Sequence, residues 1–261
     1  MGNAVSDKQK RLLVMLNEFN KYCISHGIIY YVAFGTMLGT VRDKGFIPWD
    51  GDVDIMMNLE EYEKLLEHSK KEKIQNCLLV NYKTNKHIPS FFAKVFEDSV
   101  DERRLEEYPY IEIAVFTGAP KSRLHKRLMW LKSYINYEIF WAKKRIYSNN
   151  LKRAHSKIGF LIKILFFWLP SSICSKTFEK SIKKYNNSEE VFYLTSVYNE
   201  KKTAIKREWL SKKPIKMSFE TIEVPVIPDF DLFLKKLYGD YMTPIRYGRY
   251  KKAKVRGEKN A

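Results

Sequence analysis

The sequence contains few cysteines, and none of them forms a recognisable pair. Cys23, Cys77 and Cys174 are scattered, odd in number and without a CxxC spacing, which argues against both a disulfide framework and a zinc site. The five histidines show no HExxH or other paired spacing, so no metalloprotease-type site is indicated. A reducing compartment fits these absences, and we expect a cytoplasmic protein.

Long apolar runs are also missing. The N-terminal MGNAVSDKQKRLLVML has no apolar signal core. The most apolar stretch, HSKIGFLIKILFFWLPSS, is interrupted by Lys163 and is shorter than the roughly 20 residues of a membrane span. Its basic border suits a helix over residues 157–170 lying in an anionic interface, peripheral on the inner face of the plasma membrane. A hydrophobic helical hairpin packed on the core is the alternative. The flanking cations are Lys152, Arg153, Lys157, Lys176, Lys180, Lys183 and Lys184.

Negative charge is scarce relative to positive charge. The chain has 47 Lys and Arg against 30 Asp and Glu, a formal net charge of +17, which favours a polyanionic partner such as nucleic acid, an anionic membrane or a phosphate-rich polymer. An RNA-binding module would account for the charge, but the sequence has no aromatic RNP-type signature. We expect no nucleic-acid partner. With 45% hydrophobic residues over 261 positions, the chain can form a packed core.

The order of the apolar patterns predicts an α+β protein with a nucleotidyltransferase-like mixed sheet flanked by helices. Helices are expected over 7–26, after Asn58 and after Asp229, and strands over 28–34, 50–57, 77–82, 91–96, 110–116 and from 191, with a hairpin at 215–226. Residues 122–187 read as mainly helical and basic. We therefore predict a catalytic domain formed by 1–120 and 188–245, a helical basic and apolar subdomain at 121–187, and a basic tail at 246–261.

The segment GTMLGTVRDKGFIPWDGDVDI, residues 35–55, places three aspartates at alternate positions. Because alternate strand residues share one face, Asp50, Asp52 and Asp54 are expected to present their carboxylates together. Carboxylate oxygens suit Mg²⁺, which takes the rest of its ligands from water and substrate phosphates. Phosphoryl transfer is the chemistry that most needs such a site. An acidic strand face turned to solvent is the plainer interpretation.

The glycine-containing turn upstream could receive a phosphate. Gly35 and Gly39 would let backbone N–H groups approach it, and Thr36 would add a hydroxyl. Arg42 and Lys44 are available for the remaining charge, although both could simply be surface residues.

A third acid is expected on a neighbouring strand. Glu112 in YPYIEIAVFTGAP is flanked by Ile111 and Ile113, where an unpaired charge would be costly. A strand-edge acid or a structural ion pair is the alternative for Glu112.

A calcium loop is a competing interpretation of the aspartates. Asp50, Asp52, Asp54 and Glu61 fall at positions 1, 3, 5 and 12 of an EF-hand count. Position 6 is Ile55, where that loop requires glycine, so the motif's own requirements are not met.

Three blocks of the sequence resemble the LicD family. GTMLGTVRDKGFIPWDGDVDI is similar to the family signature, and YIEIAVFTGAP and LKKLYGDYMTP are similar to two further segments. Better-known members transfer phosphocholine from CDP-choline to cell-surface glycans, and fukutin-type relatives transfer ribitol phosphate from a CDP donor. Two positions depart from the usual pattern: Gly51 replaces an aspartate, and Glu112 replaces the commoner Asp.

The resemblance implies a fold, a reaction and a set of site residues. Asp52, Asp54 and Glu112 would be the catalytic acids and hold two Mg²⁺ ions, with Asp50 and Lys94 in support. Gly35, Thr36, Gly39, Arg42 and Lys44 would contact the donor phosphates. The donor would be a CDP-activated small alcohol. The acceptor would be a sugar hydroxyl of a teichoic acid, lipopolysaccharide or capsule precursor, free or lipid-linked. An NTP-dependent nucleotidyltransferase that releases pyrophosphate is the alternative.

Overall fold

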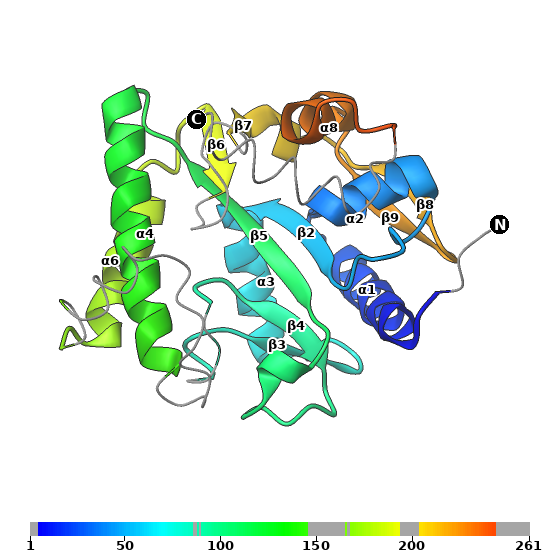
Figure 1. Cartoon of the computed structure of the whole chain (residues 1–261), viewed down its shortest axis with the longest axis horizontal. Coiled ribbons are helices and arrows are strands. Elements are labelled where there is room, and N and C mark those ends of the chain that lie inside the picture. The colour runs from blue at the N-terminus through cyan, green and yellow to red at the C-terminus, as the bar shows by residue number, and fades with distance from the viewer. Residues whose placement is uncertain are drawn as a thin grey trace.

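The computed structural model describes residues 5–85, 88, 90–145, 165, 168–193 and 204–243. Within them a curled mixed sheet is flanked by helices, and a separate two-stranded hairpin lies near the C-terminal helix (Figure 1). The predicted α+β class and mixed sheet are confirmed. The predicted domain boundaries stay a prediction, and the tail at 246–261 lies outside the described residues.

The sheet is organised around its longest described strand, β5 (Ile111–Gly118). One side of β5 pairs in parallel with β2 (Val53–Asn58), and β2 pairs antiparallel with the short β1 (Tyr31–Val32). The other side of β5 pairs antiparallel, first with β4 (Lys94–Glu97) and then, at its far end, with β6 (Glu190–Tyr193). On this side the sheet ends with β3 (Cys77–Val80) against β4 and with β7 (Ile205–Lys206) against β6, whereas β1 forms the opposite edge. Parallel pairing of β2 with β5 requires the intervening chain to cross over the sheet.

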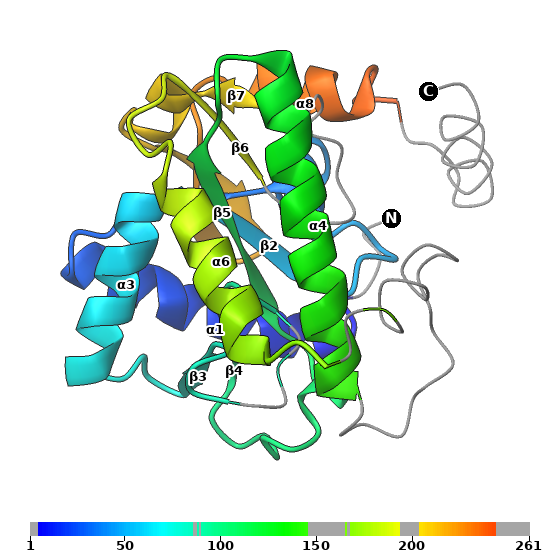
Figure 2. The ribbon, with the colours of Figure 1, turned by 90° about the vertical axis from the view of Figure 1, so that its left-hand side faces the viewer.

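Two amphipathic helices cover one face of this sheet (Figures 1 and 2). Helix α1 (Asp7–Ser25) begins at Ser6, whose side chain forms a reciprocal capping box with Gln9, and it buries an apolar stripe that includes Leu12, Leu16 and Phe19. Helix α3 (Leu59–Lys71) is capped by Asn58, whose Oδ1 accepts the Glu61 N–H at 2.9 Å. Both helices were predicted from the sequence.

Helices α4 (Arg123–Arg145) and α6 (Ser171–Lys183) lie side by side in front of β5 in Figure 2. Phe178 of α6 stacks on Phe91 with ring centroids 4.0 Å apart, which ties this pair of helices to the core. The predicted helical character of 122–187 is therefore confirmed where the chain is described. The stretch 157–170 lies outside the described residues except for Leu165 and 168–170. Among the described helices, none combines the length and the apolar character needed to cross a bilayer.

The predicted strand at 28–34 is mostly wrong. Only Tyr31 and Val32 form β1, and the chain then turns into the short helix α2 (Phe34–Leu38), with Phe34 at a φ of 41°. A single turn of π-helix, η1 (Gly39–Asp43), continues it. The run is buried on all sides, and a fully buried segment cannot be assigned to strand or helix by periodicity.

The predicted hairpin is formed by β8 (Ile215–Phe219) and β9 (Ile222–Val226), which follow the 3₁₀ turn η3 (Arg207–Leu210). Helix α8 (Phe230–Tyr238) starts after Asp229 as expected. The Asp229 side chain does not cap α8, however; it accepts a hydrogen bond from Lys212 Nζ at 2.6 Å. A further 3₁₀ turn, η2 (Leu105–Glu107), precedes β5.

Candidate active site

A row of charged side chains crosses three adjacent strands of the sheet. Asp54 of β2 is in register with Glu112 of β5, and Glu112 is in register with Lys94 of β4. Residues paired in this way present their side chains on the same face of a sheet, about 5 Å from one strand to the next. Two acids and one cation that are far apart in sequence are therefore neighbours in the fold.

Asp50 and Asp52 reach this row from a loop and not from the strand. The sequence predicted that Asp50, Asp52 and Asp54 share one strand, but β2 begins only at Val53. A turn closed by the Asp50 N–H on the Ile47 carbonyl, at 2.9 Å, precedes it. The strand-face alternation therefore applies to Asp54 alone.

Gln9 of α1 holds this loop, and sequence reasoning did not single it out. Its Nε2 donates to the carbonyl oxygens of Ile47 at 3.3 Å and Asp50 at 3.0 Å, and its Oε1 accepts the Ser6 N–H at 3.0 Å. Gln9 is almost fully buried, so each of these bonds replaces water. The Ser6-x-x-Gln9 spacing was a readable capping signal, but nothing local pointed to residues 47–50.

The four acids influence one another electrostatically. Desolvation is the main cause of a pKa of Asp54 well above its ordinary value, and repulsion from Asp52, Glu112 and Asp50 adds to it, while Lys94 opposes the shift. Desolvation likewise raises the pKa of Asp50 to about 7, with repulsion from Asp52 and the hydrogen bond that a protonated Asp50 donates to Asp52 as further causes, while the Gly51 backbone and Lys8 act against them. The cluster therefore holds more negative charge than its surroundings compensate.

Lys94 is the cation of this row. Its Nζ lies 3.5 Å from Glu112 Oε2 and 3.5 Å from the centroid of the Tyr110 ring. Both contacts favour the charged ammonium. The alternative expected for Glu112, a structural ion pair, is thus present as a contact, and it does not exclude a role for Glu112 toward a bound cation.

The donor set suits a divalent cation that is completed by substrate. All four acids offer hard carboxylate oxygens, and a cation would offset both the desolvation and the repulsion that raise the pKa of Asp54. In the described part of the chain, no three His, Cys, Asp or Glu side chains are close enough to form a ready-made metal cage. Mg²⁺ does not require one, because it commonly takes one or two carboxylates together with phosphate oxygens and water. The assignment of Asp52, Asp54 and Glu112 as ligands stays a prediction.

Thr36 connects the glycine turn to the acids. Its Oγ1 accepts the Asp54 N–H at 2.8 Å, and its carbonyl accepts the Thr40 hydroxyl at 2.7 Å. The residue is buried. Thr36 therefore positions the start of β2. The sequence predicted only that Thr36 would contact a phosphate, and did not indicate this structural role.

At Gly35 and at Gly39 a neighbouring group lies so close to the backbone that there is no room for a side chain. A methyl group on Gly35 would collide with the Asp50 carboxylate, whereas one on Gly39 would collide with the Gly45 carbonyl. Gly35 thus lies directly against the acidic cluster. Gly39 allows the loop after η1 to fold back on it, and the Gly45 N–H bonds to the Gly39 carbonyl at 3.3 Å.

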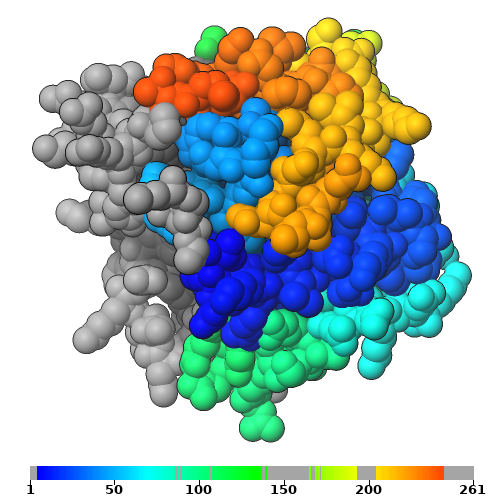
Figure 3. Space-filling model, turned by 90° about the vertical axis from the view of Figure 1, so that its right-hand side faces the viewer, coloured from blue at the N-terminus to red at the C-terminus, as the bar shows by residue number. Residues whose placement is uncertain are grey.

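Arg42 and Lys44 are tied to the C-terminal part of the chain. Arg42 forms a two-pronged contact with Asp43, at 2.7 and 3.0 Å, and its Nη1 donates to the Tyr241 carbonyl at 3.4 Å. The Lys44 carbonyl accepts the Glu220 N–H at 2.8 Å, and Glu220 Oε1 accepts the Phe46 N–H at 2.8 Å. Figure 3 shows the loop at 40–48, in light blue, enclosed by the hairpin, α8 and α1.

The EF-hand interpretation is excluded by the fold. Residues 53–58 form an extended strand that pairs with both β1 and β5, whereas an EF-hand loop curls around its ion through a glycine turn at its sixth position, which is Ile55 here. The Glu61 carboxylate, which would be the last calcium ligand, instead accepts the Ile29 N–H at 2.7 Å.

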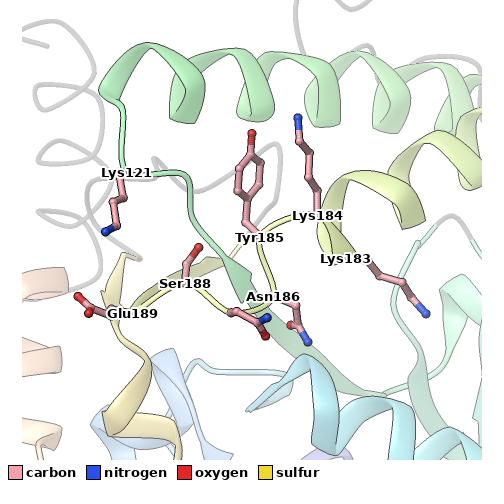
Figure 4. Close-up of a pocket in the computed structure, with 8 residues that line it drawn as sticks. Lys121, Lys183, Lys184, Tyr185, Asn186, Ser188 and Glu189 are labelled. Atoms are coloured by element: carbon pink, nitrogen blue, oxygen red, sulfur yellow. The ribbon is translucent and has the colours of Figure 1, made fainter.

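A hollow of about 350 Å³ lies at the other end of β5 from the acidic row. Figure 4 shows its lining side chains diverging, and Lys183 is engaged by Glu63 at 2.6 Å. None of the predicted site residues lines this hollow. Its lining consists of Lys121 and residues 183–189.

Comparison with known proteins gives concordant results. The family model described as "LicD/FKTN/FKRP, nucleotidyltransferase domain" matches residues 27–148. Over 247 residues, 90% of each chain, the sequence is 25% identical to the protein named "Lipopolysaccharide cholinephosphotransferase LicD" from Haemophilus influenzae. Residues 27–148 therefore carry a LicD-type domain. A shorter likeness, 31% identity over 67 residues, is to "Mannosyltransferase regulator 4" of Saccharomyces cerevisiae and covers 24% of this chain and 6% of that protein.

The LicD-like blocks that are distant in sequence meet in the fold. The signature segment and β5 lie within the residues matched by the family model and pair through β2. The C-terminal block LKKLYGDYMTP lies beyond that range, yet Tyr241 of this block contacts Arg42 of the signature through its carbonyl. The Tyr241 hydroxyl also donates to Asp231 of α8 at 2.8 Å. The three LicD-like blocks are therefore linked to one another through the pairing of β2 with β5 and the contact of Arg42 with Tyr241.

Proposed function

We propose that this protein is a Mg²⁺-dependent phosphotransferase. It moves phosphocholine, or a closely similar phosphoester, from a CDP-activated donor to a sugar hydroxyl of a cell-surface glycan. The acceptor class that we propose first is a lipopolysaccharide-type glycan. Teichoic acid and capsule precursors are the other two classes. The observation that carries the proposal is the full-length likeness to a lipopolysaccharide cholinephosphotransferase, supported by the acidic row.

In the proposed reaction the acceptor hydroxyl oxygen attacks the phosphorus that bears the choline. The bond from this phosphorus to the bridging oxygen breaks, CMP leaves, and the hydroxyl proton passes to a carboxylate of the cluster. When bound, Mg²⁺ would offset the charge of the diphosphate. Asp52, Asp54 and Glu112 are the residues that would hold it, and Lys94 beside Glu112 would limit the excess negative charge.

The Gly-Thr turn would place the donor against these acids. Gly35 lies next to Asp50 without an intervening side chain, so a phosphate could approach the backbone there closely. The Arg42 side chain, only 10% exposed, is already oriented by Asp43 and Tyr241. We propose that Arg42 and Lys44 contribute positive charge at the rim, while Thr36 and Gly39 keep the turn in shape.

CMP release tests the proposal. Purified protein is incubated with CDP-choline, Mg²⁺ and a lipopolysaccharide or teichoic acid acceptor, and a panel of other CDP-alcohols is run in parallel. We expect acceptor-dependent CMP formation that EDTA abolishes and Mg²⁺ restores. Asp52→Asn and Asp54→Asn should each lower the rate by about a hundredfold or more. Asp98→Asn, at an exposed turn after β4, is the matched control and should retain full activity.

The alternative enzyme class gives a different product. An NTP-dependent nucleotidyltransferase would release pyrophosphate and leave a nucleotide on its acceptor. The family model's description as a nucleotidyltransferase domain is the observation that keeps this class in view. Pyrophosphate release from an NTP, together with no CMP from any CDP-alcohol, would replace the proposed reaction with this one.

A further inference from the structure

Helix α4 carries an apolar stripe on the side that faces away from the core. Leu124, Leu128 and Leu131 are 64%, 53% and 46% exposed, and they recur at helical spacing, so their side chains lie along one face. Met129, Ser133 and Asn136 are buried and lie on the opposite face. An exposed leucine stripe of this length is not needed for packing within the chain.

Positive charge borders this leucine stripe on both sides. On a helical wheel Arg127 lies to one side of the stripe and Lys132 to the other, and both are exposed. The sequence contains no Asp or Glu between Gly118 and Tyr137. The stripe is therefore apolar at its centre and cationic at its edges.

The neighbouring helix repeats this combination. Ile173 of α6 is 48% exposed, Trp168 just before α6 is 65% exposed, and Lys176 and Lys180 are exposed one and two turns after Ile173. Because α4 and α6 lie side by side in front of β5 (Figure 2), both helices contribute to the same outer layer of the molecule.

The geometry points to the outer face of α4 as a surface that docks on an anionic lipid bilayer. Leucines framed by cations suit the interface between lipid headgroups and acyl chains, where apolar burial and attraction to negative lipids act together. A second copy of the chain fits poorly, because Arg127 and Lys132 would then approach their own copies without acidic partners along 118–137, and each chain carries a net charge of +17. This surface goes beyond the proposed transfer reaction.

Vesicle flotation at low ionic strength tests the surface directly. Full-length protein is mixed with vesicles of phosphatidylglycerol and phosphatidylcholine, or of phosphatidylcholine alone, with no donor or acceptor present. We expect binding to the anionic vesicles only, weakened by salt. Leu128→Gln with Leu131→Gln should lower the partition coefficient about tenfold, and Arg127→Gln with Lys132→Gln should lower it about fivefold per residue.

Matched substitutions on other faces control for general effects. Leu232→Gln removes a leucine of α8 that is 55% exposed, and Lys71→Gln removes an exposed cation of α3. Both should bind vesicles like the unmodified protein. CMP release with a water-soluble acceptor should be unchanged in the α4 variants. CMP release therefore tests the proposed reaction, and vesicle flotation tests the proposed lipid-binding surface independently of it.

Two results would overturn the inference. One is binding to anionic vesicles that is equal in the α4 variants and in the unmodified protein. The other is a stable dimer in analytical ultracentrifugation that Leu128→Gln dissociates, since the stripe would then be a contact between two copies of the chain.

Discussion

Replacing Gln9 by methionine isolates the connection between α1 and the loop that carries Asp50. Methionine has nearly the same length, so the buried volume is retained while the amide is lost. The substitution removes the two bonds that Gln9 Oε1 accepts from the N–H and the hydroxyl of Ser6, and the two that Nε2 donates to the carbonyls of Ile47 and Asp50. These carbonyls then lose a partner at a place that water does not reach easily.

Three of the four lost hydrogen bonds set the size of the effect, because the Ser6 residue is exposed and water can replace the bond that its hydroxyl makes to Gln9. At about 1 kcal/mol each, Gln9→Met should lower the free energy of unfolding by about 3 kcal/mol. Ser6→Ala is the matched comparison, because it removes the cap of α1 but leaves both loop bonds in place, and it should cost about 1 kcal/mol. For a chain of this size these losses correspond to melting temperatures lower by about 6–12 °C and about 2–4 °C.

Thermal unfolding followed by circular dichroism measures both variants, and CMP release measures the consequence for the site. We expect Gln9→Met to lower the turnover number more than Ser6→Ala at a temperature where both are folded, because the Asp50 loop loses its support. Equal melting temperatures and equal turnover for the two variants would refute the reasoning, since the bonds to residues 47 and 50 would then contribute nothing.

Three further outcomes are expected. Gly35→Ala should lower CMP release strongly with little change in melting temperature, because only the Asp50 carboxylate must move to make room for the methyl group. Gly118→Ala, in contrast, should lower the melting temperature strongly, because its methyl group would collide with the Tyr185 backbone. Thr36→Val should lower the unfolding free energy by about 1–3 kcal/mol, as the Asp54 N–H loses its acceptor, and Thr36→Ser should retain most of it; urea unfolding checks both. Asp54→Asn should melt higher than the unmodified protein without metal, since a raised carboxyl pKa means that the charged form opposes folding. In scanning fluorimetry this variant should also lose any stabilisation by Mg²⁺, and a lower melting temperature without metal would contradict the proposed repulsion.

Local signals were sufficient for the helices and for most strands. Amphipathic spacing correctly predicted α1, and the Asn58 cap correctly predicted the start of α3, because these signals lie within a few residues of each helix. The alternation in the hairpin at 215–226 was equally local. The run at 28–34 failed because its conformation depends on tertiary contacts, including the Ala33 N–H bond to the Asp54 carbonyl at 2.9 Å.

The candidate site was predictable in composition but not in geometry. An acid within an apolar strand correctly suggested that Glu112 lies beside the aspartates, and the register places it next to Asp54. The sequence could not indicate that β2 begins after Asp52, because that start depends on the turn at 47–50 and on Gln9. Nor could it indicate that Glu220 closes over Phe46, since the two residues belong to distant segments.

The parallel pairing of β2 with β5 has a consequence for the order in which the protein assembles. Asp54 and Glu112 are brought together only after the whole excursion through α3, β3 and β4 has been synthesised, and such non-local closure is slow compared with the formation of single helices. During translation, α1 and α3 can therefore form well before the acids meet. The repulsion among those acids arises late, when neighbouring structure is already present to hold them.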